Sequence, residues 1–291
     1  MSRVDVRKTY KLFIGGKFPR SESGRTYPAA SRRGKFQANV AQASRKDARD
    51  AVRAARAAQP GWAGATAYNR GQVLYRVAEL LEERRDQFAS QVRAGEGVSS
   101  KRAEDLVSAA IDRWVWYAGW SDKVAQVGGN ANPVAGPFFN ISTPEPTGVV
   151  AVIAPQKSSL LGLVSVLAPV IVTGNTAVVL ASADRPLPAV TLSEVLATSD
   201  VPGGVVNVLT GHTAEVAPHL ATHADVNAID VSGAVGAEGV TWGELEEAAA
   251  ETLKRVRRPL TDEEPDYANE QSLSQILAFT EVKTVWHPKG A

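Results

Sequence analysis

The pattern of apolar and polar residues changes its period near residue 148. Before this point, apolar residues recur at helical spacing in three stretches, which predict amphipathic helices over about 44–61, 73–88 and 103–117. Ser44 is followed three residues later by Asp47, close to a capping box, and this pair predicts the start of the first helix. Because each helix has one apolar stripe, each is expected to pack against another element.

After residue 148, short apolar runs rich in β-branched residues alternate with helical stretches. Such runs are typical of strands that are buried on both faces of a parallel sheet. They predict strands over 149–154, 176–180, 205–209 and 228–231, with helices over about 160–172, 188–198 and 214–223 between them. The alternation predicts an α/β fold, a doubly wound, Rossmann-like open parallel sheet with right-handed crossovers and additional N-terminal helices.

The remaining segments have weaker patterns. Gly15 and Gly16, flanked by apolar residues, predict a hairpin over 11–18. Residues 23–34 are expected to form an exposed loop, and residues 128–137 a connector. Residues 138–146 are expected to be an extended segment. The two prolines near its C-terminal end confine that end to the edge of a sheet. One more helix is expected over 244–258, with basic residues at its end, then a mobile acidic linker over 261–271 and a strand over 279–286. The predicted units are therefore 1–136, 137–147, 148–240, 241–271 and 272–291.

Composition excludes several classes of function. The 291 residues include 32 basic and 31 acidic residues, so there is no excess positive charge to suit nucleic acid or an anionic membrane. The longest apolar run, 159–180, is interrupted by Pro169 and Gly174, so it does not predict a membrane span. The basic stretch that includes Arg3 and Arg7 has no apolar core behind it, so no signal peptide is expected. The absence of cysteine excludes disulfides and thiolate metal sites and is consistent with a cytoplasmic location.

Four segments carry a resemblance to a known family, the NAD(P)-dependent aldehyde dehydrogenases. Residues 145–155 read EPTGVVAVIAP and resemble that family's EPxGVVxxIxPWN. Residues 167–180, LAPVIVTGNTAVVL, resemble LAPALAAGNTVVLK, and residues 201–211, VPGGVVNVLTG, resemble PPGVVNVVTG. Residues 223–233, HADVNAIDVSG, resemble HPDVDKIAFTGS. These matches are collinear, so the chain is identified as a member of this superfamily that lacks the counterpart of the catalytic domain.

The resemblance implies a dinucleotide site at the carboxyl ends of the first parallel strands. The positions that match it are Ala154, Pro155, Gln156, Lys157, Ser182, Asp184 and Gly233. Three positions depart from the family pattern: Lys157 replaces an Asn of the oxyanion hole, Ala181 replaces the ribose-binding Lys, and Ala234 replaces the Ser after Gly233. Losing the Lys removes one charge-assisted contact, roughly 1.5–3 kcal/mol, so NAD(P) binding is expected to be weakened. No metal is expected.

Candidate chemistry is sparse. The chain has no cysteine, and no counterpart of the family's general-base Glu is found after Gly233, so no catalytic residue is assigned. Ser158 and Ser159 beside Lys157 could form a nucleophile and base, but a solvated loop is the favoured interpretation. His219 and His223 have a spacing that can hold a metal, although two surface histidines are favoured because no third ligand stands nearby.

The functional hypothesis rests on the segments that remain. The resemblance implies that residues 138–146 and the terminal strand form the family's oligomerisation arm. The chain is therefore predicted to be a catalytically inactive or accessory subunit that associates with a full-length aldehyde dehydrogenase. A homodimer and a decayed paralogue remain open. The alternative function is an oxidoreductase that acts on aldehyde or oxo groups with NAD(P) as acceptor.

Overall fold

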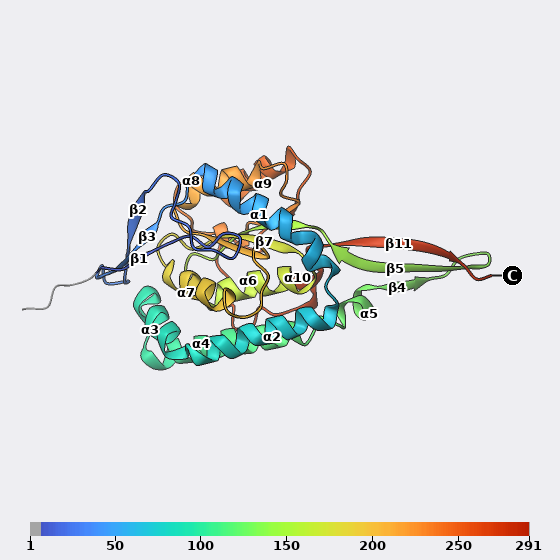
Figure 1. Ribbon diagram of the computed structural model, residues 1–291, viewed down its shortest axis with the longest axis horizontal. Helices are drawn as coiled ribbons and strands as arrows, with labels where there is room; N and C mark the ends of the chain where they lie inside the picture. The colour runs from blue at the N-terminus through green and yellow to red at the C-terminus, as the bar shows by residue number, and fades with distance from the viewer. Residues whose placement is uncertain (1–6, 291) are drawn as a thin grey trace, which may run out of the picture.

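Five parallel strands form the central sheet of the computed structural model, which describes residues 7–290 (Figure 1). The strands are β6 (Val149–Ile153), β7 (Thr176–Leu180), β8 (Val206–Leu209), β9 (Ala228–Asp230) and β10 (Arg255–Arg257). Their order across the sheet is β10-β9-β6-β7-β8, and every neighbouring pair is parallel. Every residue of β6, β7, β8 and β9 is buried, which confirms the doubly wound α/β fold and the four predicted strands.

Helices cover both faces of this sheet. The helices on one face are α1 (Arg45–Gly64), α8 (Thr213–Ala221) and α9 (Trp242–Ala250). The other face carries α6 (Leu161–Val172) and α7 (Leu187–Leu196), which are backed by α2 (Ala67–Glu83), α3 (Arg85–Glu96) and α4 (Ser100–Ala118). All twelve residues of α6 are buried, because this helix lies between the sheet and the outer helices. The apolar stripes of the N-terminal helices form this additional layer.

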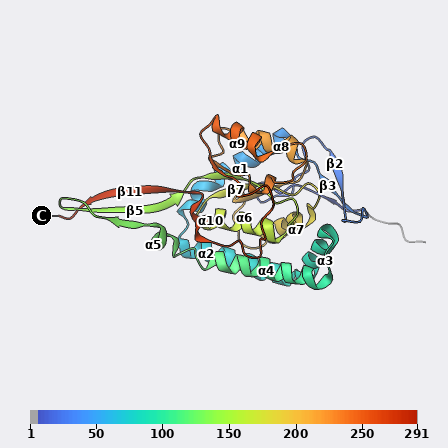
Figure 2. The ribbon, with the colours of Figure 1, turned by 180° about the vertical axis from the view of Figure 1, so that it is seen from behind.

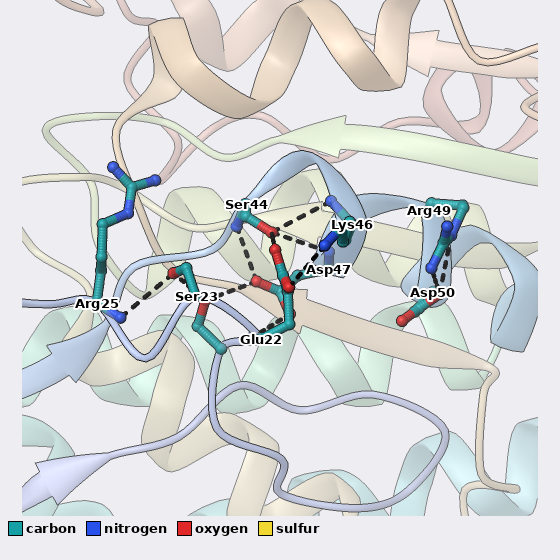
Figure 3. Close-up of polar contacts among 9 residues, drawn as sticks. Glu22, Ser23, Arg25, Ser44, Lys46, Asp47, Arg49 and Asp50 are labelled. Atoms are coloured by element: carbon teal, nitrogen blue, oxygen red, sulfur yellow. Dashed lines mark hydrogen bonds and ion pairs between the residues drawn. The ribbon is translucent and has the colours of Figure 1, made fainter.

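The start of α1 follows the sequence prediction closely. The Ser44 hydroxyl accepts hydrogen bonds from the backbone N–H groups of Lys46 and Asp47, and the Asp47 carboxylate accepts the Ser44 N–H at 2.8 Å, which completes a capping box (Figure 3). The same carboxylate accepts the Ser21 hydroxyl at 2.7 Å and the Glu22 N–H at 3.1 Å. One buried aspartate therefore fixes both the helix start and the preceding loop.

Several expected boundaries were wrong. Helix α1 continues through Pro60 to Gly64, and the expected second helix is two, α2 and α3, which meet at Arg84. The expected loop at 23–34 contains β2 (Thr26–Ala30), which lies with β1 (Thr9–Tyr10) and β3 (Phe36–Ala41) in a small sheet ordered β1-β3-β2. The hairpin turn at Gly15 and Gly16 is confirmed, since Ile14 bridges Lys17 and both glycines have positive φ.

The segment after Gly233 differs most from its sequence prediction. The expected helix over 244–258 ends at Ala250, and β10 follows as a fifth strand of the central sheet. The basic residues therefore do not lie at the end of a helix. The acidic segment over 261–271 is not a free linker, because Tyr267 is buried in the core and the carbonyls around it accept hydrogen bonds from Arg113.

A three-stranded antiparallel sheet projects from the body as an arm (Figures 1 and 2). It consists of β4 (Asn130–Asn132), β5 (Phe138–Pro146) and β11 (Thr280–Pro288), in the order β11-β5-β4. Two short helices, α5 (Val124–Gly128) and α10 (Leu273–Leu277), lead into β4 and β11. Part of the expected connector at 128–137 is thus strand β4. Strand β4 pairs with β5 only at residues 140–142, so Pro144 and Pro146 lie at the end of β5 that pairs with β11 alone.

Within residues 7–290, no helix has both the length and the apolar character needed to cross a membrane. Arg3 of the basic N-terminal stretch and the last residue of the unit predicted over 272–291 lie outside the described residues.

Candidate functional site

The candidate site lies at the carboxyl end of β6, where the strand order reverses. Strand β6 has β7 on one side and β9 on the other, so the chain leaves β6 in one direction and later returns to its opposite edge. Open α/β sheets bind ligands in the crevice at such a switch point. The structure places most of the residues predicted for the dinucleotide site at this edge of the sheet.

Gln156 and Ser182 link the ends of β6 and β7. The Gln156 amide nitrogen donates to the Ala154 carbonyl at 2.7 Å, and its side-chain oxygen accepts the Ala183 N–H at 3.3 Å. The Ser182 hydroxyl donates to the Gln156 carbonyl at 3.0 Å. Both side chains are buried, and their polar groups are used within the protein.

Gly233 is placed against the end of β6 by close packing. A Cβ atom at this position would lie 2.1 Å from the Ile153 carbonyl oxygen and 2.6 Å from the Pro155 nitrogen. Only a residue without a side chain fits between these backbone atoms. This packing alone accounts for a glycine at position 233, and contact with a ligand is not needed to explain it. Asp184, by contrast, is exposed and lines a small surface hollow with Ala30 and Pro188, away from Gly233.

The turn between β6 and α6 carries three backbone N–H groups that two carboxylates accept. Glu264 accepts the N–H of Lys157 at 2.7 Å and that of Ser158 at 3.2 Å, one with each carboxylate oxygen. Glu96, at the end of α3, accepts both the N–H and the hydroxyl of Ser159, at 2.8 and 2.7 Å. Burial raises the pKa of Glu96 above its ordinary value, against the lowering effect of its hydrogen bonds to Ser159.

The expected solvated loop around Ser158 and Ser159 is therefore wrong. Ser159 is buried and donates to Glu96, while the Ser158 hydroxyl accepts the Gly162 N–H at 2.9 Å and so caps the first turn of α6. The side chain of Lys157 is exposed. Both hydroxyls stabilise the turn, and no lysine–serine hydrogen bond accompanies them within residues 7–290, so the geometry gives no support to a Ser–Lys catalytic pair.

The segment 259–270, which we call the strap, brings Glu264 to this turn. Arg113 of α4 holds its far end: the guanidinium donates to the carbonyls of Tyr267 and Glu270, at 2.7 Å each, and to the Ser165 hydroxyl at 2.6 Å. At its near end, the Trp242 indole N–H donates to the Asp262 carboxylate at 3.2 Å. The strap is thus attached to the body at three places.

A buried ion pair fixes the strand that leads into the strap. Arg257 of β10 lies opposite Asp230 of β9 in the strand register, and its guanidinium nitrogen is 2.8 Å from the Asp230 carboxylate. The other oxygen of Asp230 accepts the Ser232 N–H at 2.9 Å. The Asp230 charge raises the pKa of Arg257. This pair explains why a short basic segment can form the partly exposed edge strand of the sheet.

Sequence reasoning missed these structural residues: Glu96, Arg113, Asp230, Arg257 and Glu264. Alternation in Arg255-Val256-Arg257 was the available signal for a strand, and it was too short to outweigh the helical pattern before it. Nothing local marks Glu264 within its acidic run, because its partners are about a hundred residues away in the sequence.

An open cavity of about 470 Å³ lies between the strap and the body. It is lined by Lys157, Ser158 and Leu161 on one side, by Glu96, Arg102 and Leu106 on another, and by Glu264 and Tyr267 from the strap. Four carboxylates line its wall, Glu96, Glu263, Glu264 and Asp266, and two of them, Glu96 and Glu264, accept backbone N–H groups of the turn. With the strap in this position, the N–H groups of Lys157 and Ser158 are not free to bind an anionic ligand, because Glu264 accepts both of them.

No metal centre accompanies this site. Across residues 7–290, no three His, Asp or Glu side chains gather closely enough to hold a metal ion. His219 and His223 line a separate cavity with Arg45, Lys46 and Arg49, and the Nδ1 atom of His223 accepts the Asp225 N–H at 3.1 Å. Three neighbouring cations disfavour a divalent metal at this pair.

Comparison with known proteins gives the same fold and a set of related sequences. The sequence model described as the aldehyde dehydrogenase family matches residues 20–258, so this match extends past Gly233 and includes β10. Aldehyde dehydrogenase, cytosolic 1 of Elephantulus edwardii is 31% identical over 272 residues, 91% of this chain and 52% of that protein. Retinal dehydrogenase 2 of Gallus gallus is 32% identical over 284 residues, 92% of this chain and 53% of that protein.

Solved structures agree with these relatives. The NAD⁺ complex of aldehyde dehydrogenase from Bacillus cereus superposes with a TM-score of 0.79 at 27% identity, covering 86% of this chain and 50% of that one. The chain spans about half the length of the curated relatives that it matches. Because the family model covers well over half of the sequence, this chain belongs to the aldehyde dehydrogenase family.

Proposed function

We propose that this chain is a non-catalytic accessory subunit that binds a full-length aldehyde dehydrogenase through its arm. The observation that carries the proposal is the long ribbon of β5 and β11, which pair from Thr280 opposite Pro146 to Pro288 opposite Phe138. This ribbon extends away from the body, so most of its surface is not used by the chain's own core (Figures 1 and 2). A stable ribbon whose surface is not packed against its own chain is suited to binding a partner subunit.

The register assigns the exposed apolar side chains of the arm to its faces. Residues paired across an antiparallel ladder share a face, so Ile141 and Val285 lie together, with Phe139 two residues along the same strand. These three side chains are 45%, 48% and 53% exposed. A group of apolar side chains of this kind favours burial against another protein surface.

The outer edge of β11 offers a second means of binding. Within the described residues, β5 is the only strand that pairs with β11, so one row of its backbone groups faces outward. Exposed strand edges accept a partner strand by main-chain hydrogen bonds. A sheet edge in a related dehydrogenase subunit would supply the matching row, and we place this assembly in the cytosol because a close relative is named as cytosolic.

The experiment isolates an affinity-tagged chain from its native host and identifies the bound proteins by mass spectrometry. We expect a full-length aldehyde dehydrogenase family subunit in the eluate of the wild-type chain and its loss from that of Val285→Arg. Tyr75→Arg is the matched control, because Tyr75 is also 48% exposed but lies on α2. An eluate without any dehydrogenase would contradict the proposal, and a tagged chain that recovers only copies of itself would identify a homo-oligomer instead.

A second candidate function is an oxidoreductase that uses NAD(P), favoured by the likeness to the NAD⁺-bound Bacillus cereus structure. Its requirements are a nucleophile for the aldehyde and a usable dinucleotide crevice. The sequence contains no cysteine, and Glu264 occupies the crevice donors. We therefore expect the pure chain to form no NADH from a panel of aldehydes. NADH formation by the pure chain would favour this second candidate over the first.

A further inference from the structure

A cavity of about 580 Å³ lies at the end of the molecule opposite to the arm (Figure 1). It lies between the turn that joins β2 to β3 and the corner where α3 meets α4, and it shares only Val98 with the crevice at β6. We call it the basic cavity, because four cationic side chains line it and no carboxylate does. These side chains are Arg32, Arg33, Lys35 and Arg93.

The four cations of the basic cavity have no ion-pair partner within residues 7–290. The cations beside His219 differ in this respect, because Arg49 pairs with Asp50 at 2.9 Å. Lys46 of the same cavity pairs with Glu22 at 3.2 Å. The chain has 31 acidic residues against 32 basic ones, so overall charge does not explain four unpaired cations around one hollow. Their mutual repulsion is relieved when an anion binds among them.

Both walls of the basic cavity are held in place by contacts of the chain itself. The Arg32 N–H donates to the Ala94 carbonyl at 2.8 Å, which ties the turn to α3. A Cβ atom on Gly97 would lie 2.8 Å from the Arg32 Cγ, so the stem of Arg32 lies closely against the end of α3. On the facing wall, the Arg93 guanidinium donates to the Ser100 hydroxyl at 3.1 Å. The arginines are therefore positioned before a ligand arrives, which reduces the entropy that binding would cost.

We propose that the basic cavity binds a small polyphosphate, a ligand that carries two or more linked phosphate groups. Guanidinium groups match phosphate oxygens with paired N–H donors, and a cleft lined by one sign of charge concentrates the opposite charge. The volume of the cavity is that of a small-molecule site. A nucleic acid strand fits less well, because the four cations surround one hollow and the whole chain has a net charge of only +1. The proposal is independent of arm binding, which involves the other end of the molecule.

The decisive variants remove one charge from each wall of the basic cavity. Arg32→Gln acts on the turn and Arg93→Gln on α3, and both side chains are exposed. Asp86 and Glu104 line an adjoining hollow with Arg93, so part of its charge is already balanced and its loss should have the smaller effect. Arg53→Gln is the matched control, because Arg53 is also exposed but lies on α1, on the other face of the central sheet.

The experiment titrates each chain with sodium tripolyphosphate by isothermal calorimetry, after urea denaturation has shown that the variants are folded. We expect the wild type and Arg53→Gln to bind equally, Arg32→Gln to bind about tenfold more weakly, and Arg93→Gln to lie between them. A wild type that does not bind tripolyphosphate would overturn the proposal, as would equal affinities in all four chains. A single-stranded oligonucleotide that binds the wild type more tightly than tripolyphosphate would also overturn it, in favour of a nucleic acid surface.

Discussion

Replacing Arg113 with Met tests whether the strap is an integral part of the fold. Arg113 lies in the buried face of α4, and its guanidinium donates to the carbonyls of Tyr267 and Glu270 and to the Ser165 hydroxyl. Burial lowers the pKa of this guanidinium, against the raising effect of the neighbouring Tyr117 and Glu270. Its four hydrogen bonds, the fourth of which goes to the Ala268 carbonyl at 3.3 Å, must therefore offset the cost of removing the charge from water.

The magnitude follows from the groups that Met would leave without a donor. Each carbonyl that becomes unsatisfied in a buried position costs about 1–3 kcal/mol. Met carries no charge, so the folded variant no longer bears the desolvation cost of a buried guanidinium, which offsets part of this loss. The Met side chain also fills much of the vacated volume. We expect Arg113→Met to lower the free energy of unfolding by about 3 kcal/mol, close to the range found for loss of a buried polar partner.

Urea denaturation gives this free energy, and hydrogen exchange reports on residues 266–270 separately. Arg102→Met is the matched control, because Arg102 lies on the same helix but is exposed. We expect the control to change stability by less than about 0.5 kcal/mol. The reasoning is refuted if Arg113→Met and Arg102→Met are equally stable and residues 266–270 keep the same protection in both.

Three further predictions concern the site and its supports. Gly233→Ala is expected to destabilise the fold by about 3 kcal/mol in thermal or urea unfolding, because its Cβ would overlap backbone atoms at the end of β6. The control is Gly243→Ala on α9, which has open space around it and should be neutral or slightly stabilising. Asp230→Asn leaves its arginine partner unpaired and should cost about 3 kcal/mol by the same measurement, while loss of the exposed Arg255 should cost under about 1 kcal/mol. Burial raises the pKa of Glu96 above its ordinary 4.5, so the folded state binds a proton more tightly than the unfolded state. The free energy of unfolding of the wild type should therefore fall relative to that of Glu96→Gln as pH rises above 4.5. Parallel pH profiles of the two free energies would contradict this.

The periodic elements of this protein could be predicted because their signals are local. The strands β6 to β9 and the helices between them are long enough, and apolar enough, for composition and spacing to identify them. The capping pair of Ser44 and Asp47 is equally local, since both partners lie within one turn of α1. The motifs in 145–233 also placed Gln156, Lys157 and Gly233 at one edge of the sheet, which the structure confirms.

The candidate site was predicted less well than the fold. The sequence placed Ser158 and Ser159 in a solvated loop, but burial beside Glu96 and the start of α6 gives both hydroxyls structural partners. It also took the segment after residue 244 as one helix, because a run of alanines and charges has high helical propensity. Pairing with β9 through Asp230 and Arg257 overrides that propensity at the end of the run.

The sequence by itself determined the class of fold, the family and the arm, because each depends on residues that are neighbours or that follow a fixed order along the chain. Only the tertiary structure decided what fills the crevice. Glu264 reaches the turn at Lys157 across 107 positions, and Arg113 holds the carbonyl of Glu270 across 157. Contacts at such separations depend on how helices and strands pack, so no local pattern encodes them, and a segment that resembled a free linker becomes the element that occupies the site.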